Sequence, residues 1–265
     1  MSEDEGSRRT GTQVFSRADA LLAELEKSSE PLTLTALSRA TGLSASTAHR
    51  ILGALAGMGL ADRDENGAWS LGLRLIGLGR LVYERSALRR RAQDAMLKLQ
   101  RTTGASVSLA IRRGDRAVFI ETIASEGFGR APNVPAPGSS EFLHRCSAGL
   151  LFLSELTPEE LREYAGRTGI ANAPLDALDR LLIELTRIRE NGWAGKMSAG
   201  APGAASAVAA PVRGPGGRLA AALSLSAAEP QAIPPGFIAE LCAAAERVSS
   251  EAGAPSPLES SLRMR

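Results

Sequence analysis

The sequence predicts an α+β protein in two parts, and three observations lead to that prediction. A chain of 265 residues is long enough for two ordinary domains of about 100–200 residues each. Apolar residues recur at helical spacing as far as Gly104, whereas from Val107 they alternate with a period of two, as in strands. Strand pairs interleaved with helices after that point indicate an α+β second domain.

The first helix is expected to follow a disordered N-terminus. Residues 1–14 are polar and are expected to be disordered. Ser16 stands three residues before Asp19, which resembles a capping box, so a helix is expected from Ser16 to about Lys27. Its apolar stripe consists of Leu21, Leu22 and Leu25.

Two further short helices are expected to be joined by a tight turn. Thr35 is expected to cap the second helix, with Leu37 and Ala40 facing inward, and Gly42 suits a left-handed position at its end. Ser44 is expected to cap the third helix. Two short helices joined by a glycine-containing turn are typical of a helix-turn-helix. The buried face of the third helix is expected to hold Ala48, Ile51, Leu52 and Leu55.

The outward face of that third helix carries small, polar and basic residues without any acid. No Asp or Glu occurs between Glu30 and Asp62. A local basic surface on a chain with a net charge of only +2 favours a polyanionic partner, although a solvated helix face is the alternative. A face of this kind can enter the major groove of DNA.

A β-hairpin is expected directly after the third helix. Asn66-Gly67 between two short runs is a strong hairpin signal, and a hairpin in this place is a wing. The acidic tip is not expected to enter a groove deeply, because phosphates repel it. Double-stranded DNA is therefore the predicted partner of segment 15–72. The candidate DNA-contacting residues are Thr35, Ser44, Ala45, Ser46, Thr47, His49, Arg50, Arg63 and Trp69.

A linker helix is expected over residues 73–86, and it is apolar on more than one side. Gly77 and Gly79 permit close approach of another helix. A helix that is apolar all round must be buried. We therefore expect it to pack across a homodimer, with burial against its own domain as the alternative. Its apolar residues include Leu73, Ile76, Leu78, Leu81 and Val82.

The second domain is expected to span residues 87–253, followed by a mobile tail, 254–265. Its first two strands are expected around Val107 to Ile111 and Val118 to Thr122, followed by a loop at 124–140. The later helices are expected over 147–154, 158–165, 175–191 and 235–250, and two more strands over 206–213 and 218–226.

Composition and motifs exclude most other classes of function. Hydrophobic residues at 44% and charged residues at 23% are typical of a globular protein, and no stretch is long and apolar enough to span a membrane. Two distant cysteines and an acidic N-terminus lead us to expect a cytoplasmic protein. His144 and Cys146 lack the spacing of a zinc site, and no phosphate loop or nucleophile elbow occurs. We expect no enzyme activity, cofactor or metal.

Several motifs together resemble the IclR family of bacterial transcription regulators. They include the run from Leu37 to Leu52, Trp69-Ser70-Leu71-Gly72, and Ile188-Arg189-Glu190-Asn191-Gly192-Trp193. The resemblance spans about residues 15–250. It implies a winged helix-turn-helix, a linker helix and a GAF-like effector-binding domain, in dimers or dimers of dimers on near-palindromic operators. Where relatives carry Thr and Lys, this chain has Cys146 and Leu150, which makes its pocket atypical.

The resemblance also implies where an effector binds. It makes one face of the second sheet a wall of the pocket, and hydroxyl groups with nearby cations suit a carboxylate, so an organic acid is predicted. A regulator modulated by this ligand is the first interpretation; a ligand-independent repressor whose second domain only oligomerises is the second. The candidate effector-binding residues are Arg130, Ser147, Lys196, Ala207, Ser224 and Ser226.

Overall fold

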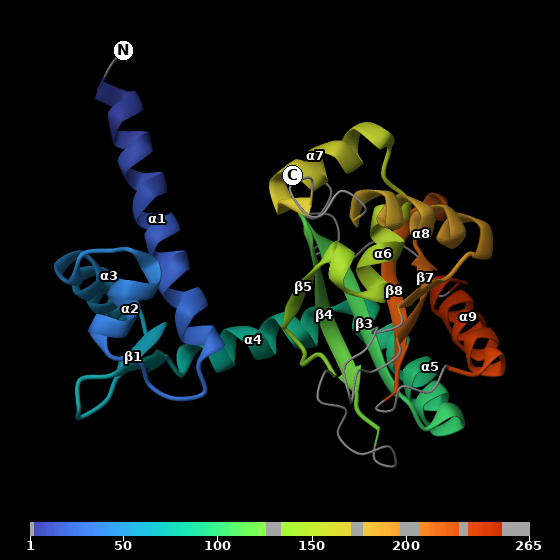
Figure 1. Cartoon of the computed structure of the whole chain (residues 1–265). Helices are drawn as coiled ribbons and strands as arrows, with labels where there is room; N and C mark the ends of the chain where they lie inside the picture. Colours follow the sequence, from blue (N-terminus) through green and yellow to red (C-terminus); the bar gives the residue numbers. More distant parts are fainter. Residues whose placement is uncertain (1–2, 126–133, 171–176, 197–206, 228–232, 251–265) are drawn as a thin grey trace. The chain divides into compact units, whose positions relative to one another are not determined.

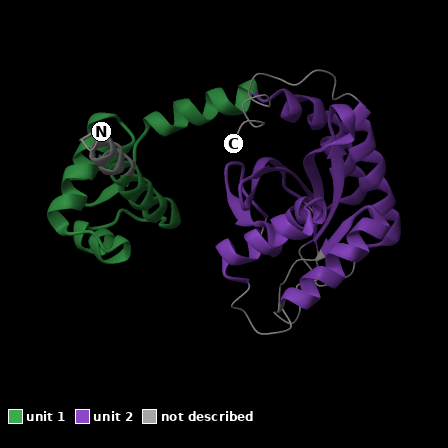
Figure 2. Ribbon diagram, turned by 90° about the horizontal axis from the view of Figure 1, so that it is seen from above, with its two compact units in different colours: residues 1–85 green, residues 86–265 purple. Residues whose placement is uncertain are grey.

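The computed structural model describes residues 3–125, 134–170, 177–196, 207–227 and 233–250. The chain divides into two compact units, residues 1–85 and residues 86–265, which Figure 2 shows in different colours. Each unit has its own hydrophobic core and is described by itself.

Three helices open the first unit: α1 (Glu3–Lys27), α2 (Leu34–Thr41) and α3 (Ala45–Gly57). Gly42 ends α2 with φ 67°, the left-handed conformation that glycine adopts without strain. Ser44 then caps α3, as expected, because its hydroxyl accepts a hydrogen bond from the Thr47 amide. The three helices and the wing share one core, formed by Leu21, Leu25, Leu37, Ala48, Ile51, Leu52, Leu55, Ala61 and Trp69.

Three expectations for these helices were wrong. Helix α1 begins at Glu3, so residues 3–14 are helical rather than disordered. That segment contains no proline, and extending an existing helix adds one hydrogen bond for each residue fixed. Thr33, and not Thr35, caps α2, since its hydroxyl accepts from the Ala36 amide at 3.2 Å. Ala40 is exposed rather than inward-facing, and Leu37 is the residue of α2 that is buried.

The predicted wing is present as strands β1 (Ala61–Arg63) and β2 (Trp69–Leu71), which pair antiparallel. Asp64 closes its turn: the Asp64 amide donates to the Ala68 carbonyl, and the Ala68 amide donates to the Asp64 carboxylate at 2.7 Å. On the other edge of β2, Leu32 and Trp69 exchange two backbone hydrogen bonds of 2.8 Å. The hairpin is thereby fixed to the segment that precedes α2.

Helix α4 (Arg74–Arg85) follows the wing at the place of the predicted linker helix. Its start is anchored to the winged part: the Leu73 amide donates to the Asp62 carboxylate, and the Arg74 guanidinium donates to the Met58 carbonyl at 2.8 Å. All of α4 is described, and none of its residues is buried. Burial against its own domain, the alternative considered above, is therefore wrong.

The second unit is built on one antiparallel sheet in the order β5-β4-β3-β8-β7-β6 (Figure 1). Gly114, with φ 56°, lies in the turn between the first two long strands. The strands are β3 (Ser106–Arg113), β4 (Arg116–Ile123), β5 (Ser140–Phe142), β6 (Ala194–Lys196), β7 (Ala207–Arg213) and β8 (Leu219–Ser226).

Helices cover both faces of this sheet. Helices α5 (Ala87–Thr103) and α9 (Pro235–Ser250) contact each other and one face, through β3 and β7. Helix α6 (Ser147–Ser154) lies on the other face against β7 and β8, with α8 (Ala177–Asn191) beside it. Alternate residues of the long strands β3, β4, β7 and β8 therefore pack into two separate cores, one on each face of the sheet, which confirms the α+β prediction.

Strands β5 and β6 were not predicted, and β5 ends the stretch expected to be a loop. Each has three residues, too few for a period of two to be read. Helix α7 (Pro158–Thr168) ends three residues later than residue 165, its expected end. Gly169 then caps it with φ 75°. Among the described residues, no helix is long and apolar enough to cross a membrane.

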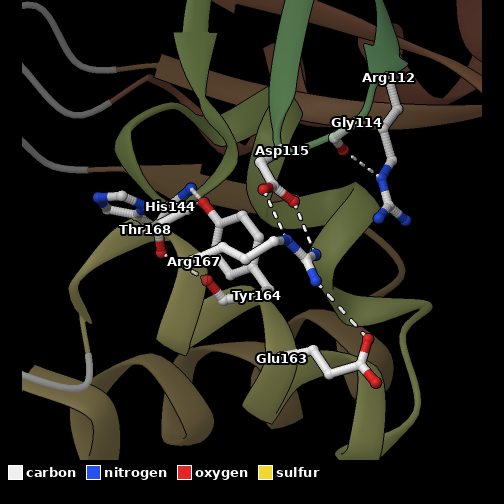
Figure 3. A network of polar contacts seen from close by, with 8 residues as sticks. All are labelled: Arg112, Gly114, Asp115, His144, Glu163, Tyr164, Arg167 and Thr168. Atoms are coloured by element: carbon white, nitrogen blue, oxygen red, sulfur yellow. Dashed lines mark hydrogen bonds and ion pairs between the residues drawn. The ribbon is translucent and has the colours of Figure 1, made fainter. Parts of the chain in front are cut away.

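A polar network ties the β3–β4 turn to α7 (Figure 3). Arg167 donates two hydrogen bonds of 2.9 Å to the Asp115 carboxylate and lies 3.6 Å from Glu163. The hydrogen bond from Arg167 holds the pKa of Asp115 below its usual value, although partial burial opposes this shift. Beside this pair, the Tyr164 hydroxyl accepts a hydrogen bond from the His144 amide at 3.1 Å.

Candidate DNA-binding face and effector site

Helix α3 presents a polar face to solvent, opposite its buried stripe. Ser46, His49 and Arg50 are exposed and Thr47 is half-buried, whereas the four predicted core residues are buried. A serine-rich cluster lies at the start of this face. The Ser44 hydroxyl donates to the Thr47 hydroxyl at 2.9 Å and lies 3.2 Å from that of Ser46.

The exposed start of α3 can bind phosphate and base edges. Ala45 is the first residue of α3 and is exposed, so the backbone of the first turn is accessible. Helix N-termini attract anions through unpaired amides and the helix dipole, and the first turns of α2 and α3 contain no acid to oppose this. Thr35 is exposed within α2, so its hydroxyl remains available although it caps nothing.

The two predicted contact residues of the wing pair with each other across the hairpin but differ in exposure. Arg63 is exposed and its Nε donates to the Gly67 carbonyl at 3.3 Å. Trp69 is only 3% exposed and belongs to the core. The prediction that Trp69 contacts DNA was therefore wrong, because its indole is buried in the core of the first unit and the exposed guanidinium of Arg63, its partner across the hairpin, lies over the ring.

In the second unit, strand register brings several hydroxyl side chains onto one face of the sheet. Ser224 pairs with Ser108 of β3 on one side and with Ala209 of β7 on the other. Ser226 likewise pairs with Ser106 and with Ala207. Directly paired residues share a face. The predicted residues Ala207, Ser224 and Ser226 are thus brought together.

This hydroxyl face also contains three residues that the sequence analysis missed. Ser106 and Ser108 are each 2% exposed, and Thr122 of β4 pairs with Ser108 of β3. The Thr122 hydroxyl donates to the Pro135 carbonyl at 2.7 Å, and that of Ser224 donates to the Ser108 carbonyl at 3.3 Å. The signal was present, because serine occupies the alternate positions 106 and 108 between apolar residues.

The remaining effector candidates differ in how the structure treats them. Ser147 is buried as the first residue of α6, the helix that covers this face; Cys146 caps that helix, its thiol accepting from the Gly149 amide at 3.3 Å. Lys196 ends β6 opposite Ala207, and its side chain lies outside the described residues. Arg130 also lies outside them.

His144 and Cys242 both lie in partly buried positions. His144 Nδ1 lies 2.7 Å from the Tyr164 hydroxyl, and its ring stacks on Phe142. Burial raises the pKa of Tyr164 above its usual value, and burial also raises the pKa of the Cys242 thiol. Within the described ranges, no group of three His, Cys, Asp or Glu side chains is placed to hold a metal ion.

A buried ion pair joins α5 to the far side of the same sheet. Arg89 Nη1 lies 2.7 Å from Glu121 Oε2, and the two side chains are 11% and 8% exposed. Glu121 precedes Thr122 of the hydroxyl face, and Ser86, which caps α5, directly follows α4 in the chain. The pair therefore fixes the first turn of α5 to β4.

Together these features define a winged helix-turn-helix DNA-binding protein with a second, α+β unit. The family described as "IclR helix-turn-helix domain" matches residues 15–65, and that described as "Bacterial transcriptional regulator IclR C-terminal" matches residues 81–250. The chain belongs to the IclR family of bacterial transcriptional regulators.

Individual relatives agree with this assignment. The chain is 32% identical to the HTH-type transcriptional regulator XynR of Escherichia coli over 218 residues, 81% of this chain and 85% of XynR. It is also 32% identical to the HTH-type transcriptional regulator KipR of Bacillus subtilis, over 61% of this chain and 65% of KipR. Both relatives are HTH-type transcriptional regulators.

Solved structures share the fold. An IclR homolog from Microbacterium hydrocarbonoxydans, complexed with 4-hydroxybenzoate, superposes with a TM-score of 0.74 at 22% identity. The match covers 91% of this chain and 100% of that one. It supports the architecture of a helix-turn-helix unit followed by an α+β unit.

Proposed function

We propose that this protein is a cytoplasmic regulator whose binding to a near-palindromic DNA operator is modulated by a small organic acid. The observation that carries the proposal is the exposed, acid-free face of α3 beside a wing, in a chain whose second unit holds a buried row of hydroxyls. We propose that it acts as a homodimer or a dimer of dimers, because α4 leaves apolar side chains uncovered.

The proposed DNA contacts divide by position. Ser46, Thr47 and Arg50 of α3 face the major groove, and Arg63 of the wing lies beside it. Ser44, Ala45 and Thr35 lie at helix N-termini, where amides and hydroxyls suit phosphate oxygens. His49 shares the exposed face of α3 but also packs against the wing, at a ring centroid distance of 6.2 Å from Trp69.

Arg50→Ala tests the recognition face. We expect a loss of about 1–3 kcal/mol of binding free energy for an operator obtained by selection from random duplexes, because an exposed guanidinium pairs with guanine or phosphate. Fluorescence anisotropy distinguishes a base contact from a phosphate contact. Loss of a base contact relaxes specificity at one operator position, measured on operator variants, whereas loss of a phosphate contact reduces the dependence of affinity on salt concentration.

Arg187→Ala provides the control, since Arg187 is exposed on α8 in the second unit. It should leave operator affinity unchanged. Unchanged affinity in Arg50→Ala itself would remove Arg50 from the interface.

The proposed effector site is the hydroxyl face of the sheet, with Ser147 at the start of α6. Lys196 and Arg130 are kept in the proposal on the family resemblance, since the Lys196 side chain and all of Arg130 lie outside the described residues. Hydroxyls arranged beside small residues such as Ala207 and Ala209 can hydrogen-bond a carboxylate. The 4-hydroxybenzoate held by the Microbacterium relative makes aromatic acids a sensible first set of ligands.

Calorimetric titration of the full chain with small organic acids, beginning with 4-hydroxybenzoate, tests this site. We expect at least one acid to bind, and Ser224→Ala to weaken its binding about threefold to tenfold through the loss of one hydrogen bond. Ser250→Ala, at the exposed end of α9, is the matched control. A ligand that proves cationic, or an acid whose affinity is unchanged in both Ser224→Ala and Lys196→Ala, would contradict the proposed site.

A further inference from the structure

Trp69 lies where the recognition helix, the wing and the segment before α2 meet. Its indole is 3% exposed and packs in the core of the first unit. Its backbone pairs with Arg63 on one side and exchanges hydrogen bonds with Leu32 on the other. A change in this ring therefore acts on three segments at once.

Two side chains of the proposed DNA-binding face rest on this ring. The Arg63 guanidinium carbon lies 5.5 Å from the ring centroid, within the range of a cation–π contact. The His49 ring meets the indole nearly perpendicularly, at 81° and 6.2 Å between centroids. His49 comes from α3 and Arg63 from the wing, and both are exposed.

The Arg63 side chain is held at a second point as well. Its Nε donates to the Gly67 carbonyl at 3.3 Å, and a Cβ on Gly67 would lie 2.9 Å from an Arg63 terminal nitrogen. Glycine at 67, with φ 81°, thus both forms the turn and leaves space for the guanidinium. The cation is fixed between the turn and the indole before any DNA is bound.

The indole itself gains no hydrogen bond from this position. Trp69 Nε1 is buried and has no hydrogen-bond partner among the described residues. Leaving a buried donor unpaired is costly, and phenylalanine would avoid that cost. What tryptophan offers beyond phenylalanine is a larger ring and the strongest cation–π surface of the aromatic residues.

We propose that Trp69 is a positioning residue that sets the wing against the recognition helix by holding Arg63 and His49 on one ring. This inference rests on the proposed DNA binding. Because Arg63 is ordered in advance, less side-chain entropy is lost when DNA binds. Trp69 touches no DNA and acts through Arg63 and His49.

The test compares Trp69→Phe, Arg63→Met and the double variant on an operator selected from random duplexes by the wild-type chain. We expect Trp69→Phe to lower operator affinity about threefold to tenfold, and Arg63→Met about tenfold or more. The double variant should bind only slightly more weakly than Arg63→Met, because Trp69 acts mainly through Arg63 and only its contact with His49 remains to be lost. The urea midpoint of Trp69→Phe should stay close to that of wild type, because removal of the unpaired indole donor offsets part of the cost of the smaller ring.

Trp193→Phe is the matched control, since it replaces the other tryptophan, in the second unit. It should leave operator affinity unchanged. Effects of Trp69→Phe and Arg63→Met that multiply fully, or full operator affinity in Trp69→Phe, would overturn the positioning role while DNA binding stands. If wild-type protein selects no sequence at all, the proposed function fails, and this inference falls with it.

Discussion

Replacing Leu81 with arginine is expected to yield monomers and to lower operator affinity about 100-fold or more. Leu81 is 42% exposed on α4, where Ile76 and Val82 are 69% and 62% exposed. A helix with so much uncovered apolar surface is stabilised by a partner, and a second copy of the chain presents the same surface. In the homodimer proposed above, an arginine at position 81 would place a charge in the apolar interface.

The loss in affinity follows from losing two-site binding. A dimer that holds one half-site binds the second at high effective concentration, and a monomer loses that gain. Light scattering at micromolar concentration measures the mass, and anisotropy on full and half operators measures the affinity. Wild type should prefer the full operator strongly, whereas Leu81→Arg should bind both about equally.

Leu182→Arg is a closely matched control. Leu182 is also 42% exposed, but it lies on α8 of the second unit. We expect this variant to keep the dimer and its preference for the full operator. A dimer that persists in Leu81→Arg with unchanged operator binding would show that α4 is not the interface.

What the sequence could predict depends on how local the determining contacts are. Ser44 and Gly42 specify the start of α3 and the end of α2 through bonds within a few residues, so both ends were predicted. The wing was predicted for the same reason, from Asn66-Gly67. At the start of α2, Thr33 and Thr35 are both possible caps, and only the backbone conformation distinguishes them.

Features set by distant contacts were harder to predict. Ser108 reaches the hydroxyl face through simultaneous pairing with Thr122 and Ser224, and register across three strands is not encoded locally. Trp69 was misassigned because a tryptophan on a short hairpin suits both a DNA contact and a core. Pairing with Leu32, far away in sequence, decides that it is core.

Breaking the buried Arg89–Glu121 pair is expected to have the largest effect on stability. Arg89→Met leaves the Glu121 carboxylate, 8% exposed, without its 2.7 Å partner. Removing one member of a buried pair typically costs about 3–5 kcal/mol, because the cost of burying the remaining charge is no longer offset by its ionic partner. The Thr122 amide still donates to Glu121 Oε1 at 3.0 Å, but a neutral donor compensates a charge less than a guanidinium does. We expect a loss of that size in the unfolding free energy of the second unit.

Urea unfolding followed by Trp193 fluorescence in a Trp69→Phe background measures the second unit separately, since Trp193 is then the only tryptophan. Arg167→Met is the contrasting variant. It breaks the Asp115–Arg167 pair, whose side chains are 24% and 51% exposed, and should cost much less than Arg89→Met because solvent screens that pair.

The double variant Arg89→Met, Glu121→Leu separates the pair's net contribution from the cost of an orphaned charge. Two apolar residues of similar volume should recover most of the lost stability, because desolvation of both charges is avoided. The double variant can be stable and bind the acid, while its operator affinity no longer changes when the acid is added. In that case the pair transmits ligand binding from β4 to the start of α5. If Arg89→Met alone costs less than about 1 kcal/mol, the pair does not fix α5 to the sheet.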